Sequence, residues 1–247
     1  MSGAHIAYVL HQADRAMILA QQLCAWVANA PDFDDDLALS NIALDLIGQA
    51  RALYAHAGAL EGAGRSEDHL AFLRDADEFL SPPLVEQPNG DFAQTIARQV
   101  LHDAYALALW QALRASADEV LAAIAAKAAN ETRYHLRYSS EWLIRMGDGT
   151  EESLRRAQAA LELLWPYALE LFQQDAIEVE MTHAGIGADP HALRAAWEIT
   201  LREILAKTDL CPPASNAAHL GGRRAPAFAA LLAEMQLSHR QHPGAAW

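Results

Sequence analysis

The sequence predicts an all-α protein built as a helical bundle. Residues that favour helices, above all Ala, Leu, Glu, Gln and Arg, dominate the 247-residue chain. Apolar residues recur at spacings of three and four over long stretches, and the alternating pattern of strands is almost absent. Four long helices followed by shorter ones are therefore expected to form a single domain over residues 1–247.

The first two helices should supply much of the core. Residues 5–29 carry one apolar stripe with helical spacing. The second helix, expected over residues 31–60, begins with several aspartates, as a helix N-terminus prefers. It then stays apolar on most of its sides, which predicts a central position.

A long irregular segment should follow over residues 61–90, because it ends in prolines and an Asn-Gly turn. Asp91 and Gln94 resemble a capping box that opens a third helix over about residues 91–115. Ser116 and its partner three residues later should open the fourth helix in the same way.

The glycine-containing sequence MGDGT should end that fourth helix at Gly147. Thr150 is expected to open a fifth helix that runs to about residue 183. Pro190 suits the first turn of a sixth helix, which should end before the prolines at 212–213. A last helix is expected over residues 226–241.

Composition excludes several classes of function. The formal net charge of −14 argues against a nucleic-acid partner, since phosphate binding relies on clustered Lys and Arg. The N-terminus lacks the basic and apolar pattern of an export signal, and no long uncharged apolar run predicts a membrane span. Cys24 and Cys211 have no metal-ligand spacing and fit a reducing compartment. A cytoplasmic protein is expected.

Four polar residues stand on apolar helix faces. Asp103 shares a face with Ile96 and Val100, and Asp45 is enclosed by apolar neighbours. Glu131 and His135, in the sequence ETRYH, follow the apolar spacing of the fourth helix. Because buried charges need partners, these four residues are predicted to form one polar cluster, although each could also be an isolated core residue. A cation, Arg51 or Arg133, could offset the charge.

The cluster has the arrangement of a metal site but too few ligands. A di-iron bundle takes one Glu from each of two helices and a Glu-x-x-His pair from each of the other two. The first helix offers no carboxylate on its predicted interior stripe, and the residue three before His135 is Thr132. The Glu180–His183 pair has the right spacing but stands at a helix end, so we expect no metal in this chain.

Other motifs add little. The sequence contains no GxSxG, phosphate-binding loop, dinucleotide fingerprint or HExxH motif. The basic GGRR turn at 221–224 is expected at the surface. The histidines at 5, 11, 56, 69 and 102 are scattered, and most are expected in solvent.

Several sequence blocks resemble the C-subunit family of bacterial phenylacetyl-CoA epoxidase, the multicomponent 1,2-phenylacetyl-CoA monooxygenase. The blocks are ALSNIALDLIGQAR (38–51), LVEQPNGDFAQTIARQ (84–99), ETRYHLRYSSEWLIRMGDGT (131–150), ALRAAWE (192–198) and the terminal PGAAW. They occur in order over essentially the whole chain.

The resemblance implies a ferritin-like four-helix bundle with additional C-terminal helices. It implies an iron-free structural subunit that stabilises a catalytic A subunit, which carries the di-iron centre. B and D subunits and a reductase would complete the system, in aerobic phenylacetate degradation. Under this reading the cluster of Asp45, Asp103, Glu131 and His135 is vestigial, and the chain has neither catalytic residues nor a cofactor of its own.

The resemblance also implies that two segments could approach the CoA ester. These segments comprise Glu78, Phe79, Leu80 and Ser81 before the LVEQPNG sequence, and Val179, Glu180 and Met181 near the end of the expected fifth helix. Phe79 is the one residue suited to stacking on a ligand. A surface loop that braces the bundle is the alternative for the first segment.

Two other functions remain open from the sequence. The chain could be an iron-dependent oxygenase with an atypical ligand set, or a ligand-binding bundle without a catalytic partner. The second helix bears on the choice, because one bundle core covers only a stripe of a helix about 100° wide. Its remaining apolar surface predicts a partner interface or self-association.

Overall fold

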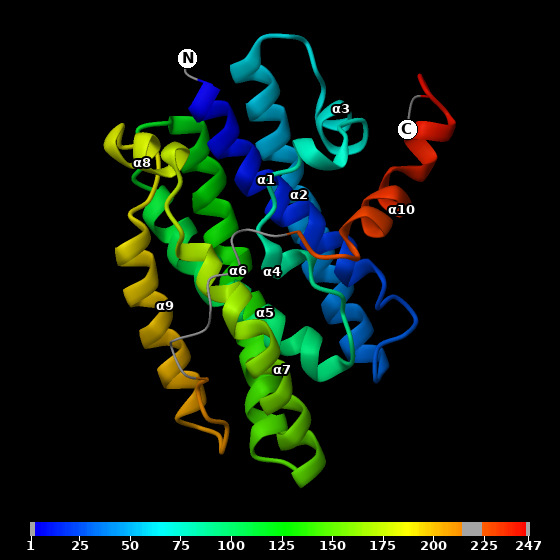
Figure 1. The fold of residues 1–247 in the computed structure, drawn as a ribbon, viewed down its shortest axis with the longest axis vertical. Coiled ribbons are helices and arrows are strands. Elements are labelled where there is room, and N and C mark those ends of the chain that lie inside the picture. Colours follow the sequence, from blue (N-terminus) through cyan, green and yellow to red (C-terminus); the bar gives the residue numbers. More distant parts are fainter. Residues whose placement is uncertain (1–2, 214–223, 246–247) are drawn as a thin grey trace. The chain divides into compact units, whose positions relative to one another are not determined.

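Helices make up the regular structure of residues 3–213 and 224–245, which this computed structural model describes (Figure 1). The chain divides into two compact units, one of residues 1–88 with 224–247 and the other of residues 89–223. The single domain expected from the sequence therefore stays a prediction. None of the described helices is long and apolar enough to cross a membrane.

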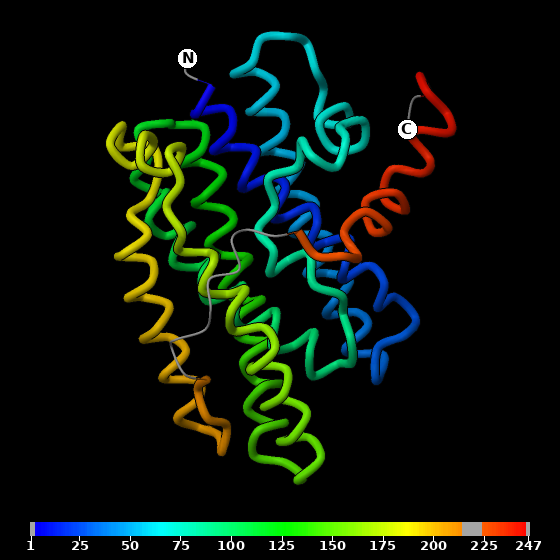
Figure 2. The backbone as a smooth tube through the Cα atoms, viewed as in Figure 1, coloured from blue at the N-terminus to red at the C-terminus, as the bar shows by residue number. Residues whose placement is uncertain are grey.

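The first unit is built on two long helices and shorter elements packed against them. Its elements are α1 (Gly3–Cys24), α2 (Phe33–Glu61), α3 (Glu67–Phe72), the 3-10 turn η1 (Ala76–Glu78), α4 (Pro83–Glu86) and α10 (Phe228–Gln241). The long pair α1 and α2 packs most extensively, while α3 contacts α2 and α4 contacts α1. Figure 2 shows the chain after α2 turning back along this pair.

Hydrogen bonds and backbone angles of nearby residues determine where the first two helices begin and end. Helix α1 ends at Cys24, short of the predicted residue 29, and Ala28 adopts a left-handed φ of 62° that a helix cannot contain. The Ala28 N–H donates to the Asp36 carboxylate at 2.8 Å. Asp32 caps α2 by accepting from the Asp35 N–H at 2.9 Å, and Gly62 ends it with φ 69°.

The predicted irregular segment is held by a buried carboxylate. Asp14 is fully buried on α1. It accepts hydrogen bonds from the Tyr54 hydroxyl at 2.6 Å, the Leu80 N–H at 2.7 Å and the Arg74 guanidinium at 3.1 Å. Arg74 is itself 3% exposed, so this is a buried ion pair. It joins α1 and α2 to the chain that follows α3.

The expectation that the first helix lacks an interior carboxylate is therefore wrong. Asp14 lies beside Ala13 of the apolar stripe, so periodicity alone did not distinguish it from a surface residue. The Arg74 guanidinium packs over the Phe79 ring, 4.2 Å from its centroid, and the Arg74 carbonyl accepts from Gln236 of α10 at 2.9 Å. Four segments of the first unit thus meet at one arginine.

A second buried carboxylate anchors the start of the last segment. Glu86 is fully buried and accepts from the Ser81 hydroxyl at 2.8 Å and the Ala225 N–H at 3.0 Å. The Arg224 guanidinium pairs with it. Residues 221–223 of the predicted basic turn lie outside the described residues, while Arg224 serves this ion pair.

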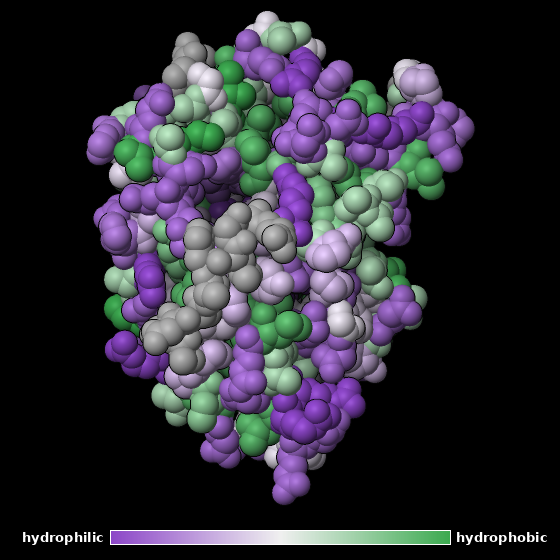
Figure 3. All heavy atoms as spheres, in the orientation of Figure 1, coloured by the Kyte–Doolittle hydropathy of each residue, from purple (hydrophilic) through white to green (hydrophobic). Residues whose placement is uncertain are grey.

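The described part of the second unit, residues 89–213, is built on two long helices and shorter ones packed with them. Its elements are α5 (Phe92–Leu113), α6 (Glu119–Gly147), α7 (Glu151–Leu169), the 3-10 turn η2 (Glu170–Phe172), α8 (Ala176–His183) and α9 (Pro190–Leu205). Helix α5 packs against α6, α7 and α9. Figure 3 shows hydrophilic residues covering the end of the α6–α7 hairpin, where Glu152 pairs with Arg155 and Arg156.

Helix starts in this unit were predicted in part. Asp91 and Thr150 cap α5 and α7, and Pro190 opens α9, as expected. The cap of α6 is Asp118 rather than Ser116, whose hydroxyl instead donates to the Ile186 carbonyl at 2.8 Å.

The predicted fifth helix is interrupted. It breaks after η2, and α8 begins anew because the Asp175 carboxylate accepts from the Glu178 N–H at 2.9 Å. An N-cap of this kind favours a new helix start over continuation.

Replacing Asp14 by Asn should lower the free energy of unfolding by about 3–5 kcal/mol, because it leaves the buried Arg74 charge without its partner. Asp75→Asn is the matched control. Asp75 and Arg240 form an ion pair at 3.0 Å, and both side chains are exposed. Such a pair should contribute under about 1 kcal/mol to stability. Urea denaturation of both variants measures the difference. An equal decrease in the free energy of unfolding of both variants would show that the buried ion pair stabilises the fold no more than the exposed one.

Candidate functional site

The candidate site lies on the facing sides of α5 and α6 in the second unit. Asp103 and His135 are each 1% exposed, so the apolar spacing predicted their burial correctly. Both helices carry them within long apolar faces, where a polar side chain must find partners.

Three neighbouring groups stabilise the Asp103 carboxylate. Ser139 donates its hydroxyl to Oδ2 at 3.0 Å, and Nδ1 of the buried His102 lies 3.0 Å from Oδ1. His135 acts on the carboxylate electrostatically. Both carboxylate oxygens are thus engaged by side chains of α5 and α6.

Burial dominates the ionisation of this cluster. Desolvation raises the pKa of Asp103 to about 7, while His135, the Ser139 hydroxyl and Arg98 oppose the rise. Desolvation also lowers the pKa of Arg98 to about 9, against the attraction of Asp103. At neutral pH, Arg98 is therefore protonated and Asp103 lies near its midpoint.

Arg98 is the cation of this cluster, in place of the expected Arg51 or Arg133. Its side chain is 1% exposed and donates to the Asn89 side-chain oxygen at 2.7 Å. Arg51 is exposed and pairs with Glu67, and the exposed Arg133 donates to Asn130. Arg98 and His102 are four residues apart on α5, which places them on one face of the helix. This spacing could have predicted that both side chains are buried.

The other two members of the predicted cluster have different surroundings. Glu131 keeps a side-chain exposure of 15% and pairs with Lys127 at 3.2 Å along α6. Asp45 is half-buried on α2 and belongs to the first unit. The structure therefore brings Asp103 and His135 together, whereas a single cluster of all four residues stays a prediction.

Three of the histidines expected in solvent are buried instead. His102 belongs to the Asp103 cluster. In the first unit, His5 and His56 are 8% and 9% exposed, and their rings meet edge to face at 6.2 Å between centroids. The scatter of these residues along the sequence concealed a pairing between α1 and α2.

The donors of α5 and α6 do not fit a di-iron centre. A di-iron bundle draws four carboxylates and two imidazoles from its helices, including Glu-x-x-His pairs. Asp103 is already held by Ser139 and His102, and Glu131 is paired with Lys127. The buried Arg98 guanidinium adds a positive charge that would oppose a metal cation.

The two segments expected near a CoA ester contain both core and surface residues. In the first unit, Glu78 is exposed, Leu80 is half-buried and Ser81 is bound to Glu86. Phe79 is 1% exposed beneath Arg74 and against Phe228, so its ring is covered. In the second unit, Val179 and Glu180 are exposed on α8 and Met181 is buried. Contact with a CoA ester stays a prediction.

Comparison with known proteins gives consistent matches over the whole chain. The model of a family described as phenylacetic acid catabolic protein matches residues 1–247. The C subunit of the 1,2-phenylacetyl-CoA epoxidase of Escherichia coli (strain K12) is 45% identical over 244 residues, which are 98% of each chain.

A solved structure supports the fold. A Synechococcus protein with aldehyde deformylating oxidase activity is 18% identical, covers 96% of this chain and 98% of its own, and has a TM-score of 0.59. This likeness confirms the predicted all-α, ferritin-like helical bundle.

The ionisation of Asp103 should make stability depend on pH. Between pH 4 and 7 the folded protein keeps a proton on Asp103 that the unfolded chain releases, because the pKa rises from 3.8 to about 7 on folding. Raising the pH through this window should therefore lower the free energy of unfolding, by up to about 1.4 kcal/mol per pH unit.

Asp103→Asn should remove this part of the pH dependence, since the amide is neutral and still accepts from Ser139. Urea denaturation at several pH values measures it, with Glu141→Gln on the exposed side of α6 as the control. Parallel pH profiles for wild type and Asp103→Asn would contradict the assignment.

Proposed function

The chain belongs to the phenylacetic acid catabolic protein family, and we propose that it serves as the C subunit of a 1,2-phenylacetyl-CoA epoxidase. The observation that carries this proposal is the 45% identity to the C subunit of such an epoxidase over 98% of both chains. In this role the chain would work with other subunits in phenylacetate catabolism, in the cytoplasm. The catalytic partner would be the A subunit, with B and D subunits and a reductase.

We further propose that this subunit is non-catalytic and stabilises its partner. The donor set of α5 and α6 supports this, because Asp103 is held by protein groups and the positive charge of Arg98 acts on it. The polar interior would then serve folding, and di-iron chemistry would belong to the A subunit.

The outer face of α2 supports a role in assembly. Phe33, Leu37 and Leu44 share this face at helical spacing and are 75%, 48% and 65% exposed. Large exposed apolar residues in a row mark interaction surfaces more often than isolated ones do. We propose that this face contributes to an interface with the A subunit, of the size of about 2,000 Å² or more found in permanent complexes.

An iron-dependent oxygenase with an atypical ligand set is the alternative function. The similarity of the fold to a protein with oxidase activity favours it, but at 18% identity that similarity concerns the fold alone. The two functions differ in the metal content of the isolated chain.

The chain, produced with iron supplied and purified in air, should contain iron far below one atom per chain. Elemental analysis by inductively coupled plasma mass spectrometry measures this, and the A subunit prepared in parallel is the positive control. One or two irons per chain that are lost in His135→Ala would refute the non-catalytic role and favour the oxygenase.

The isolated chain should self-associate, and the A subunit of the same system should convert it to a defined hetero-oligomer. Leu44→Glu should weaken that assembly by placing a charge on the α2 face. Leu163→Glu is the matched control, because Leu163 is 51% exposed on α7. Sedimentation velocity with and without the A subunit gives the result.

Two outcomes would count against this assembly. If the chain sediments as a monomer both with and without the A subunit, the subunit role loses its support. Equal weakening by Leu44→Glu and Leu163→Glu would exclude the α2 face while leaving the subunit role intact.

A further inference from the structure

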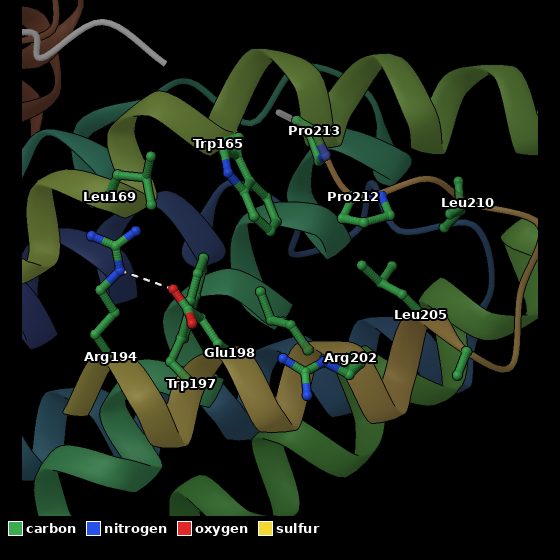
Figure 4. Close-up of a pocket in the computed structure, with 12 residues that line it drawn as sticks. Trp165, Leu169, Arg194, Trp197, Glu198, Arg202, Leu205, Leu210, Pro212 and Pro213 are labelled. Carbon is green, nitrogen blue, oxygen red and sulfur yellow. Dashed lines mark hydrogen bonds and ion pairs between the residues drawn. The ribbon is translucent and has the colours of Figure 1, made fainter. Parts of the chain in front are cut away.

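The second unit contains a cavity of about 720 Å³ between α7 and α9 (Figure 4). Its walls are mainly apolar and include Trp165, Trp197, Leu201, Leu205, Leu210 and Pro212. The Trp165 ring projects from α7 toward α9 in Figure 4. Sites for small molecules usually have this volume range, apolar walls and a few polar groups that fix orientation.

The two tryptophans of the cavity differ in their hydrogen bonds. Their rings lie 5.1 Å apart between centroids. The indole N–H of Trp197 donates to the Leu101 carbonyl at 2.9 Å, which ties α9 to α5. The indole nitrogen of Trp165 is buried and has no hydrogen-bond partner among the described residues. A buried donor without an acceptor needs an explanation, and in the wall of a cavity a bound molecule with an oxygen acceptor is one that fits.

The charged residues of the cavity leave one positive charge uncompensated. Arg194 and Glu198 form an ion pair at 2.9 Å, drawn as a dashed line in Figure 4. Arg202, one turn further along α9, is exposed and has no ion-pair partner in the part of the chain that the structure describes. The lining therefore carries two arginines and one glutamate in a chain whose net charge is −14.

We propose that this cavity binds a small organic acid with an aromatic or aliphatic body and one carboxylate. The tryptophan and leucine walls would cover the body, and Arg202 would bind the carboxylate by charge-assisted hydrogen bonds. The Trp165 N–H, which has no acceptor among the described residues, is the second polar group that an oxygen of the ligand could engage. An uncharged apolar ligand would leave both polar groups unused.

This site is independent of the proposed subunit role. Its lining residues lie on α7, α9 and the segment after α9, and none of them belongs to the Asp103 cluster. Binding of an organic acid here would add a ligand site to the chain whether or not the chain works with an epoxidase.

Calorimetric titration of the full-length chain tests the proposal. The probes are the naphthoate anion and its uncharged counterpart naphthylmethanol, which share the aromatic body and differ in charge. Naphthoate should bind at one site per chain and more tightly than naphthylmethanol, roughly threefold to fivefold, as expected for one partly exposed charge pair.

Two exposed variants should shift naphthoate binding in opposite directions. Arg202→Gln should weaken it to the level of naphthylmethanol, because the cation is lost. Glu198→Gln should tighten it, roughly twofold to fivefold, because Arg194 is released from its ion pair. Both variants should change naphthylmethanol binding less than naphthoate binding, because the hydroxyl carries no charge. Arg137→Gln, on the exposed side of α6, is the control and should change neither ligand.

Other results would overturn the proposal. Equal affinity for the two probes would show an apolar cavity without carboxylate recognition. An effect of Arg137→Gln as large as that of Arg202→Gln would place the anion elsewhere. Absence of binding by either probe would exclude the site.

Discussion

Buried carboxylates that need partners bring separate segments of the chain together in both compact units. A buried charge is costly unless it is paired and hydrogen-bonded, so each buried acid dictates which segments must meet around it. Asp14 draws Tyr54, Arg74 and the Leu80 N–H to one place, and thereby fixes the chain between α2 and α4. Glu86 similarly gathers Ser81, Arg224 and the Ala225 N–H.

Asp103 is also a buried carboxylate, but its partners stabilise its charge less completely, and its pKa is changed as a result. Ser139 and His102 contact its oxygens, while the charge of Arg98 acts on it from within the same unit. These groups do not cancel the effect of burial, and the pKa of Asp103 stays raised to about 7. The interior of α5 and α6 is therefore polar and titratable, yet its carboxylate is occupied by protein groups. That arrangement supports a structural use of these positions.

The sequence predicted local features well and long-range ones poorly, for physical reasons. Caps such as Asp91 and Thr150 depend on residues within one turn, and apolar spacing revealed the burial of Asp103 and His135. Asp14 was missed because its partner Arg74 stands 60 residues away, and periodicity does not contain that information. Asp175 was missed because its capping signal competes with a continuing apolar pattern. The cavity between α7 and α9 arises from the way these helices pack, so no sequence motif predicts it.

The two surfaces that carry the functional proposals belong to different units, and this separates their tests. The apolar face of α2 lies in the first unit, and the organic-acid cavity lies in the second. Substitutions at residues that share no partners usually have additive effects. Leu44→Glu should therefore act on assembly and Arg202→Gln on ligand binding. If Arg202→Gln also altered assembly, the cavity would have to lie at or communicate with the subunit interface, and the acid would become a candidate regulator of assembly.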